Sequence, residues 1–352
     1  MSIELRQVSL RVGAETHIYE TDLKLVEGGF NILLGTTLSG KTTLMRLMAG
    51  LEKPTTGEIW HDGENVTGVA VQKRSVAMVY QAFINYPSFS VYDNIASPLK
   101  VAGLPRSEIS DRVHRFADLL KLTPMLHRLP SELSGGQQQR TALARALVKG
   151  AGLVLLDEPL ANLDYKLREE LRDELPRLFS DTGATVVYAT SEPLEALMLG
   201  GHTATLKEGR VVQFGETSKI YRQPNNLDSA RVFSDPPVNI ATINKQGETA
   251  RLSESVSWSV PSAFAAMPDG DYKMGLRPHH LLPRGDGVEV GGEVQISEIS
   301  GSESIVRIQV EGNNWVCEAH GVHSYEFGET ASFFFDAKNC MYFDAEEHLI
   351  ST

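Results

Sequence analysis

A glycine-rich stretch near the amino terminus carries the residue types that bind phosphate. It runs from Gly35 to Thr43 with the sequence G-T-T-L-S-G-K-T-T, which has the form G-x-x-x-x-G-K-T. Mostly apolar residues 30–34 predict a strand before it, and the apolar spacing over residues 44–51 predicts a helix after it. Such a turn presents free backbone N–H groups and the positive end of the helix dipole to an anion. The stretch therefore favours a nucleotide-phosphate site over an ordinary glycine-rich surface turn.

The side chains of this loop have distinct expected roles. Lys41 would reach the β and γ phosphates of a nucleotide, and the hydroxyl of Thr42 would hold Mg²⁺. The predicted nucleotide-binding residues of the loop are Gly35, Thr36, Thr37, Leu38, Ser39, Gly40, Lys41, Thr42 and Thr43.

Two adjacent carboxylates follow a predicted buried strand. Residues 153–156 are apolar on both faces, as in a parallel strand inside a sheet, and Asp157 and Glu158 come next. Asp157 is placed to reach Mg²⁺ directly or through water, and Glu158 to polarise the water that attacks the γ phosphate. Adjacent carboxylates at a strand end are more often capping or solvated. The phosphate-binding loop in the same chain favours the catalytic interpretation.

Two polar segments add candidate ligand contacts. Residues 75–80 predict a strand that ends at Gln81, and ligands of open α/β sheets bind at that end of the strands. Farther along, L-S-G-G-Q at residues 133–137 precedes a predicted helix. Ser134, Gly135 and Gly136 place small residues and free N–H groups at the helix start, which indicates a second anion site. Taken alone, a plain turn explains this segment equally well.

Length and composition set the broad class. A chain of 352 residues predicts two domains, each with its own core. The 33 basic and 45 acidic residues give a net charge of −12, which argues against a nucleic-acid surface because phosphate binding needs clustered Lys and Arg. We expect neither a signal peptide nor a membrane span. Cys317 and Cys340 lack metal-ligand spacing, so we expect ordinary reduced thiols.

Changes in pattern along the chain predict the domain boundaries. Residues 1–34 alternate as strands do, and helical periodicity begins near residue 87. Residues 224–237 are rich in Pro and Asn and predict a linker, after which short strands alternate with turns. We predict an α/β P-loop domain over residues 1–235, with a helical subdomain over about 87–150. A C-terminal all-β barrel domain is predicted over residues 236–352.

Taken together, these stretches resemble the nucleotide-binding subunit of an ABC transporter over nearly the whole chain. The phosphate loop, V-Y-Q-A-F around Gln81, L-S-G-G-Q, L-V-L-L-D-E-P and A-N-L-D at residues 161–164 occur in family order. Residues 274–281, M-G-L-R-P-H-H-L, and F-G-E at 327–329 resemble the oligonucleotide-binding-type barrel of the maltose-type branch, which imports carbohydrates and polyols. Residues 86–99 resemble that branch as well.

The resemblance implies ATP and Mg²⁺ as cofactors and a head-to-tail dimer that sandwiches two ATP molecules. The implied metal set is Thr42, Gln81 and Asp157. Gln81 would sense the γ phosphate and signal to the membrane subunits through the surface near Asn85 and Tyr86. The residues implied to act on nucleotide held by the partner chain are Ser134, Gly135, Gly136 and Gln137.

The implied partners are two membrane-spanning permease subunits, a second ATPase chain and, indirectly, a periplasmic or extracellular solute-binding protein. No nucleic acid is expected. The implied location is peripheral, on the cytoplasmic face of the inner (plasma) membrane. The transported solute cannot be read from this chain.

The chain departs from the family pattern in its own half-site. The family's switch segment reads T-H-D-Q-x-E-A, whereas residues 190–196 read T-S-E-P-L-E-A, so Ser191 replaces the histidine in the implied catalytic set with Glu158 and Gln81. A serine cannot become cationic, and losing a positioned acid or base costs about 10²- to 10⁴-fold in rate. Val12 stands near the position of the adenine-stacking aromatic, where His17 or Tyr19 could substitute. A milder departure is the sequence T-T-L at positions 36–38.

Two interpretations follow from these departures. In the favoured hypothesis this chain is the degenerate half of an asymmetric ATPase pair: it holds ATP in a slow or silent site and lends its intact signature to a complete paralogue. The segments L-S-G-K-T-T-L-M-R-L-M-A-G-L at residues 38–51 and T-S-E-P-L-E-A at residues 190–196 resemble those of importers with two different ATPase subunits, such as the glycerol importers. In the alternative, a catalytically active homodimer works with water bridging the gap at Ser191. A soluble ABC ATPase acting on nucleic acid and a purely regulatory subunit are the remaining alternatives.

Overall fold

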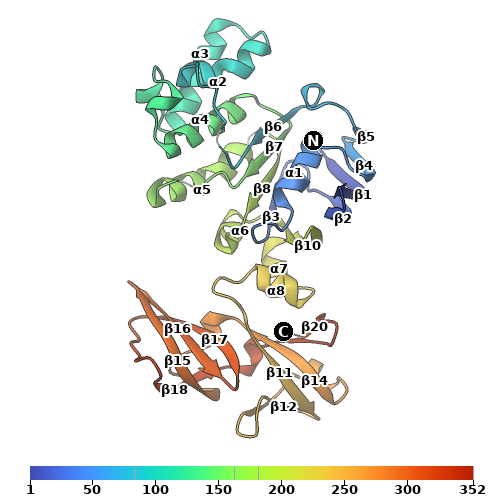
Figure 1. Ribbon diagram of the computed structural model, residues 1–352, viewed down its shortest axis with the longest axis vertical. Coiled ribbons are helices and arrows are strands. Elements are labelled where there is room, and N and C mark those ends of the chain that lie inside the picture. Colours follow the sequence, from blue (N-terminus) through green and yellow to red (C-terminus); the bar gives the residue numbers. More distant parts are fainter. Residues whose placement is uncertain (83, 162, 181, 352) are drawn as a thin grey trace. The chain divides into compact units, whose positions relative to one another are not determined.

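The computed structural model describes residues 1–82, 84–161, 163–180 and 182–351. The chain divides into two compact units, Met1–Thr217 and Ser218–Thr352. Figure 1 shows the elements of each unit in sequence colours. The first unit is a mixture of helices and strands, and the second is built mainly from antiparallel strands.

The first unit contains a small antiparallel sheet and a larger, mostly parallel one. The small sheet has the order β2-β1-β4-β5, and its strands are β1 (Ile3–Val12), β2 (Glu15–Lys24), β4 (Thr56–His61) and β5 (Glu64–Asn65). The burial of β1 alternates at its start, with Ile3 and Leu5 inside, because successive side chains of a strand point to opposite faces. The inward side chains of β1 pack in the same buried core as Leu33, which lies in the strand before the phosphate loop.

The larger sheet carries the predicted site at the carboxyl ends of its parallel strands. Its order is β10-β9-β3-β8-β7-β6, and all its pairings are parallel except β10 with β9. The strands are β3 (Phe30–Leu34), β6 (Val76–Val79), β7 (Leu153–Asp157), β8 (Thr185–Thr190), β9 (His202–Lys207) and β10 (Arg210–Glu216). Every residue of β7 and β8 is buried, as expected for parallel strands covered on both faces.

Helices cover this sheet and form a separate group in the middle of the sequence. The helices around the sheet are α1 (Lys41–Ala49), α5 (Tyr165–Ser180) and α6 (Pro193–Leu199). The middle group consists of α2 (Val91–Val101), α3 (Arg106–Leu119) and α4 (Gly135–Val148), with short 3-10 turns at η2 (Thr123–Met125) and η3 (Pro130–Glu132). Figure 1 shows α2, α3 and α4 packed together. A further 3-10 turn, η1 (Val71–Lys73), precedes β6.

The second unit packs two antiparallel sheets around one aromatic core. One sheet has the order β13-β12-β11-β14-β19-β20 and the other β17-β16-β15-β18. Trp258, Phe333 and Tyr342 belong to the shared core, and the indole Nε1 of Trp258 donates a 2.9 Å hydrogen bond to the hydroxyl of Tyr342. The predicted all-β C-terminal domain is therefore confirmed. Its strands are β11 (Asn239–Gln246), β12 (Thr249–Arg251), β13 (Ser257–Ser259), β14 (Gly270–Leu276), β15 (Val288–Ser300), β16 (Glu303–Val310), β17 (Asn313–His320), β18 (Thr330–Phe335), β19 (Met341–Phe343) and β20 (Leu349–Ser351).

The division between the units falls before the boundary expected after residue 235. Helix α7 (Thr217–Arg222) lies at the division, and α8 (Leu227–Val232) belongs to the second unit. Leu227 and Ala230 of α8 pack in a buried cluster with Val238, Met341 and Phe343. The Pro- and Asn-rich stretch thus contributes to a core. Short elements α9 (Ser262–Ala265), η4 (Pro278–His280) and η5 (Ala337–Asn339) complete this unit.

Of the helices in the described part of the chain, none has the length and apolarity that crossing a bilayer requires.

Candidate nucleotide site

The predicted phosphate loop joins the end of β3 to the start of α1. Gly40 precedes the first residue of α1 with φ 103°, a left-handed conformation, and no side chain caps this helix end. A Cβ on Gly35 would lie 2.5 Å from Ser39 Oγ and 2.6 Å from the carbonyl oxygen of Leu206. Both glycines are therefore required by the backbone path. The uncapped N–H groups at the start of α1 remain available for an anion.

Lys41 is held inside this loop. Its side chain is buried, and Nζ donates hydrogen bonds to the carbonyl oxygens of Gly35 (2.8 Å) and Thr36 (3.0 Å). Nζ also lies 3.6 Å from Oε1 of Glu158. Burial lowers the pKa of Lys41, and the carboxylates of Glu158 and Asp157 oppose that shift. A fixed ammonium group at a helix start is suited to hold a phosphate.

Asp157 and Thr42, which the sequence predicts to bind Mg²⁺, contact each other. Thr42 Oγ1 donates a 2.7 Å hydrogen bond to Oδ2 of Asp157. Burial raises the pKa of Asp157, while the Thr42 hydroxyl counteracts the rise. A buried carboxylate beside a hydroxyl is a donor set that suits a hard cation such as Mg²⁺. The residues present therefore fit the metal that the sequence predicts.

Glu158 and Gln81 meet at the same edge of the sheet. Gln81 Nε2 donates a 2.8 Å hydrogen bond to Oε2 of Glu158. Glu158 adopts φ 46°, which is rare for a residue with a side chain, and its N–H donates a 3.0 Å hydrogen bond to the carbonyl oxygen of Ala189. Strained backbone of this kind concentrates at functional sites. The structure thus brings Lys41, Glu158 and Gln81 together from three separate segments.

A cavity of about 620 Å³ opens over these groups, which is a suitable size for a small-molecule ligand. Gly35, Thr36, Asp157 and Ser191 are not part of its lining, although Asp157 contacts the lining residue Thr42. The predicted residues that line it are Thr37, Leu38, Ser39, Gly40, Lys41, Thr42, Thr43, Gln81 and Glu158.

The remaining lining comes from the β1–β2 hairpin and the β9–β10 turn. His17 and Tyr19 line the cavity, whereas Val12 does not. The guanidinium carbon of Arg210 lies 3.6 Å from the ring centroid of Tyr19. Of the two substitutes considered for adenine stacking, His17 has the freer ring, because Arg210 already covers a face of Tyr19.

Sequence reasoning missed four lining residues, namely Glu15, Thr16, Glu208 and Gly209. The N–H of Gly209 donates a 2.9 Å hydrogen bond to the carbonyl oxygen of Ser39, and the N–H of Tyr19 donates one of equal length to the carbonyl oxygen of Gly209. The turn at Glu208 and Gly209 is readable from the sequence. Its contact with the phosphate loop is long-range, so no local signal could have found it.

The switch segment lies between β8 and α6, outside the cavity lining. Ser191 is exposed there. The neighbouring Glu195 is buried and accepts hydrogen bonds from Thr190 Oγ1 (2.7 Å) and the Tyr188 hydroxyl (3.1 Å), and burial raises its pKa. Glu192 pairs with Arg168 at 3.1 Å. The carboxylates of this segment are therefore engaged by neighbouring side chains.

The predicted second anion site lies at the start of α4 and does not line the cavity. Ser134 caps this helix: its Oγ accepts from the N–H of Gln137 (3.4 Å), and Oε1 of Gln137 accepts from the N–H of Ser134 (3.0 Å). A Cβ on Gly135 would meet no atom within 4 Å. Space is thus open beside the helix start. In the loop at 161–164, Asn162 lies outside the described residues, as does Phe83 after Gln81.

Comparisons with known proteins agree with this geometry. The family described as ABC transporter matches residues 18–161. The trehalose/maltose import ATP-binding protein MalK of Thermococcus litoralis is 38% identical over 352 aligned positions, covering 94% of each chain. The chain belongs to the ABC transporter ATP-binding proteins.

Other relatives share both units of this ABC protein. The alpha-glucoside transport ATP-binding protein AglK of Rhizobium meliloti is 36% identical over 97% of this chain and 96% of its own. The osmoprotective compounds uptake ATP-binding protein GgtA of Synechocystis is 33% identical over 98% of each. A dimeric structure of the ATP-binding cassette MJ0796, bound to ADP and phosphate after hydrolysis, is 28% identical with TM-score 0.56 and covers 61% of this chain and 98% of that chain.

Membership in this family confirms the predicted P-loop fold and the cofactors. The chain is an ABC ATPase that uses ATP with Mg²⁺. Hydrolysis of that ATP is coupled to transport across a membrane.

Proposed function

We propose that this ABC ATPase energises uptake of a carbohydrate, polyol or related osmolyte. The observation that carries the proposal is the match over 94% of the chain to a protein named for trehalose/maltose import. That match extends through the second unit, so it includes more than the ATPase fold. The names of AglK and GgtA, for alpha-glucosides and osmoprotective compounds, support the same solute class. The proposed location is peripheral, on the cytoplasmic face of the membrane.

The chain's own residues divide the work of hydrolysis. The N–H groups at the start of α1 and the ammonium of Lys41 bind the phosphates and neutralise their charge. Thr42, Asp157 and Gln81 would hold Mg²⁺, which when bound would neutralise charge on the phosphate oxygens. Glu158 orients and deprotonates the attacking water. In the structure Glu158 contacts both Lys41 and Gln81, so both contacts must loosen when phosphate enters.

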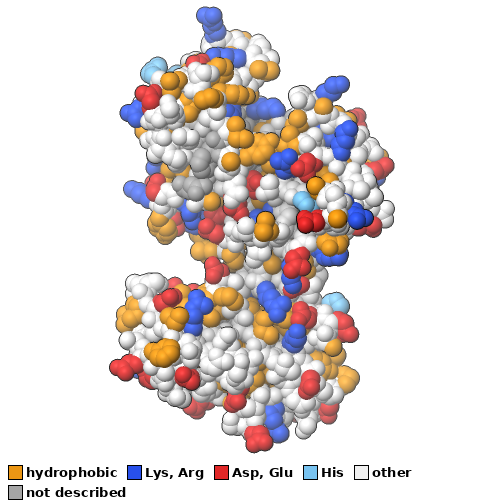
Figure 2. Space-filling view, viewed as in Figure 1, with side chains coloured by type: hydrophobic (Ala, Val, Ile, Leu, Met, Phe, Trp, Pro, Cys, Tyr) orange, Lys and Arg blue, Asp and Glu red, His pale blue; other side chains and the backbone are white. Residues whose placement is uncertain are grey.

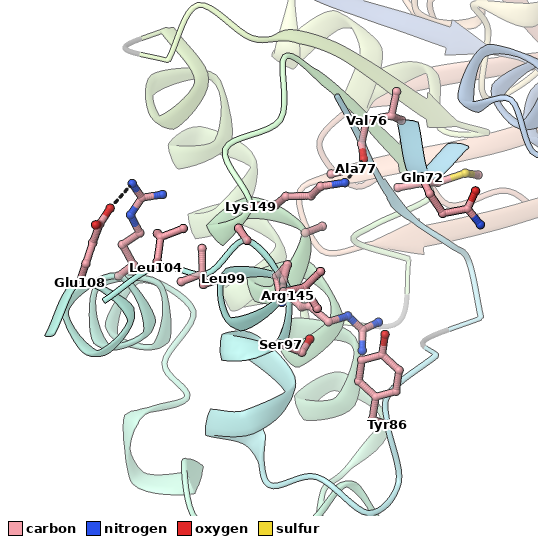
Figure 3. A pocket seen from close by; sticks show the side chains of 16 residues that line it. Gln72, Val76, Ala77, Tyr86, Ser97, Leu99, Leu104, Glu108, Arg145 and Lys149 are labelled. Carbon is pink, nitrogen blue, oxygen red and sulfur yellow. Dashed lines mark hydrogen bonds and ion pairs between the residues drawn. The ribbon is translucent and has the colours of Figure 1, made fainter. Parts of the chain in front are cut away.

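A second cavity supports a contact with permease subunits. It measures about 770 Å³ and lies among β6, α2, α3 and α4. Figure 3 shows Tyr86 beside Arg145, whose guanidinium carbon is 5.0 Å from the Tyr86 ring centroid. Figure 2 shows apolar side chains gathered over this helical group. We propose that a segment of a permease subunit fills this cavity.

Two connections within the chain link this cavity to segments that are proposed to contact nucleotide. β6 lines it and leads to Gln81 two residues later. Asn85 Nδ2 donates a 2.9 Å hydrogen bond to the carbonyl oxygen of Gln138 on α4, the helix that begins at the signature. Nucleotide bound at Gln81 or at Ser134 can therefore change the position of the adjacent residues Asn85 and Tyr86.

We further propose a head-to-tail dimer in which Ser134, Gly135, Gly136 and Gln137 act on nucleotide held by the partner chain. The open space beside Gly135 supports it, as does the absence of these four residues from the lining of the chain's own nucleotide cavity. The exposed Ser191 supports the asymmetric pair, in which the partner is a histidine-containing paralogue. The alternative remains an active homodimer.

Affinity purification from membranes of the native source tests the importer proposal. The tagged chain would be solubilised in detergent and every stoichiometric partner identified by mass spectrometry. We expect two permease subunits and a second, histidine-containing ATPase. Recovery of permeases with this chain as the sole ATPase would contradict the asymmetric pair. Recovery without any permease would contradict the importer.

A further inference from the structure

The second unit contains a cavity of about 430 Å³ with a cationic lining. It lies among α7, η4, η5 and the start of β19. No aspartate or glutamate is among the described residues that line it. The lining residues that carry or can carry positive charge are Arg222, Arg277, His279, His280 and Lys338.

Arg277 is a buried lining residue of this cavity, held in place by backbone carbonyl groups. It is only 5% exposed, and its two terminal nitrogens donate to the carbonyl oxygens of Tyr221 (2.6 Å) and Phe233 (3.3 Å). Its guanidinium carbon lies 3.8 Å from the Tyr221 ring centroid. Burial lowers the pKa of Arg277, and among the described residues no carboxylate pairs with it. A buried charge without a counter-charge is costly, so an anion at this place would stabilise the unit.

Arg222 and Lys338 are two further cations in the lining of the cavity. Both side chains are exposed, and within the described ranges neither takes part in an ion pair. They approach from different elements, α7 and η5. An anion in this cavity would therefore meet two exposed cations and one buried guanidinium.

The two histidines lie side by side in the lining, and His280 adds a neutral hydrogen-bond donor. Their ring centroids are 4.3 Å apart. Burial and the neighbouring charges lower the pKa of His280 to about 4, so its ring is neutral at pH 7 and carries one N–H. His280 Nδ1 is buried and has no hydrogen-bond partner among the described residues. Because that nitrogen is buried, a ligand oxygen would reach it only if the His280 ring turned toward the cavity.

We propose that this cavity binds a small phosphate monoester, a ligand with a dianionic head and a compact polar body. Guanidinium groups match phosphate oxygens in geometry and charge, and Tyr221 and Met341 offer surface for the remainder of the molecule. The site is separate from the nucleotide cavity, since every lining residue belongs to Ser218–Thr352.

Isothermal titration of the full-length chain with glucose 6-phosphate tests this proposal, with glucose, inorganic phosphate and citrate as comparison ligands. The Lys41→Ala background weakens binding at the phosphate loop. We expect one site for the ester, with affinity at least about tenfold above that for each comparison ligand. Arg222→Ala with Lys338→Ala should weaken ester binding by about tenfold or more, because each removes a charge-assisted contact.

The matched control is Arg251→Ala with Arg307→Ala, which removes two exposed arginines of the same unit outside the cavity. Ester affinity should not change in this control. The proposal is overturned if no ester binds, if the cavity variant binds as tightly as the parent, or if inorganic phosphate or citrate binds equally well. The nucleotide site is tested separately, since ATP binding by the unmodified chain does not depend on any of these outcomes.

Discussion

Two helices of the first unit begin at small residues. The backbone N–H groups at their starts differ in whether side chains of the same chain bind them. Helix α1 follows a left-handed Gly40 and has no side-chain cap, whereas α4 is closed by a capping box between Ser134 and Gln137. The start of α1 lies in a cavity with Lys41, Gln81 and Glu158. The start of α4 faces open space beside Gly135.

The difference supports the proposal that α1, and not α4, binds phosphate within its own chain. At α1 the N–H groups are unsatisfied and surrounded by groups that suit phosphate and Mg²⁺. At α4 two of them are already engaged with the chain's own side chains, so an incoming phosphate must arrive with other binding groups. A partner chain's phosphate loop would supply those groups.

Replacement of Lys41 by Ala should have the largest effect, because it removes the buried cation of the α1 site. We expect ATP affinity to fall about 100-fold, measured by equilibrium titration of the purified chain. Lys53→Ala, which removes an exposed lysine, is the control. Thermal unfolding of both variants would check that the fold is intact. Unchanged ATP affinity in a folded Lys41→Ala chain would mean that α1 is not the phosphate site.

Replacement of Ser191 by His tests whether the nucleotide site of this chain lacks only the switch histidine, a proton or hydrogen-bond donor, for hydrolysis. In the asymmetric pair, steady-state ATPase activity of this chain alone should rise about tenfold or more. Ser191→Asn, which cannot become cationic, should not reproduce the rise, and adding Glu158→Gln should abolish it. Equal rates for the parent and Ser191→His, both lost with Glu158→Gln, would favour the active homodimer.

Replacement of Ser134 by Ala should give the smallest effect and measures the cap on α4 directly. Losing an N-cap hydroxyl costs about 0.5–2 kcal/mol of unfolding free energy, and the 3.4 Å contact to Gln137 points to the lower end. Chemical denaturation would measure it. Ser107→Ala, at an exposed position inside α3, is the control and should change stability less. Equal changes in both variants would indicate that the cap contributes nothing.

The sequence predicted the phosphate loop, Asp157, Glu158 and Gln81 because each follows a local pattern of strand, turn and helix. It could not predict that Gly209 contacts Ser39, because that contact joins segments far apart along the chain. The same limit applies to α8, whose place in the second unit depends on packing against Met341 and Phe343. Local patterns find elements and motifs, whereas long-range packing decides which elements share a unit or a cavity.

The most direct test of the contrast between α1 and α4 is the Ser134→Arg variant of this chain in the purified transporter complex. ATP affinity of this chain and total ATPase activity of the complex would be measured on the same preparation. We expect unchanged ATP affinity in this chain and loss of hydrolysis in the partner's site, because the arginine would fill the place of the partner's γ phosphate. Reduced ATP affinity in this chain, with the partner's hydrolysis intact, would contradict the head-to-tail arrangement.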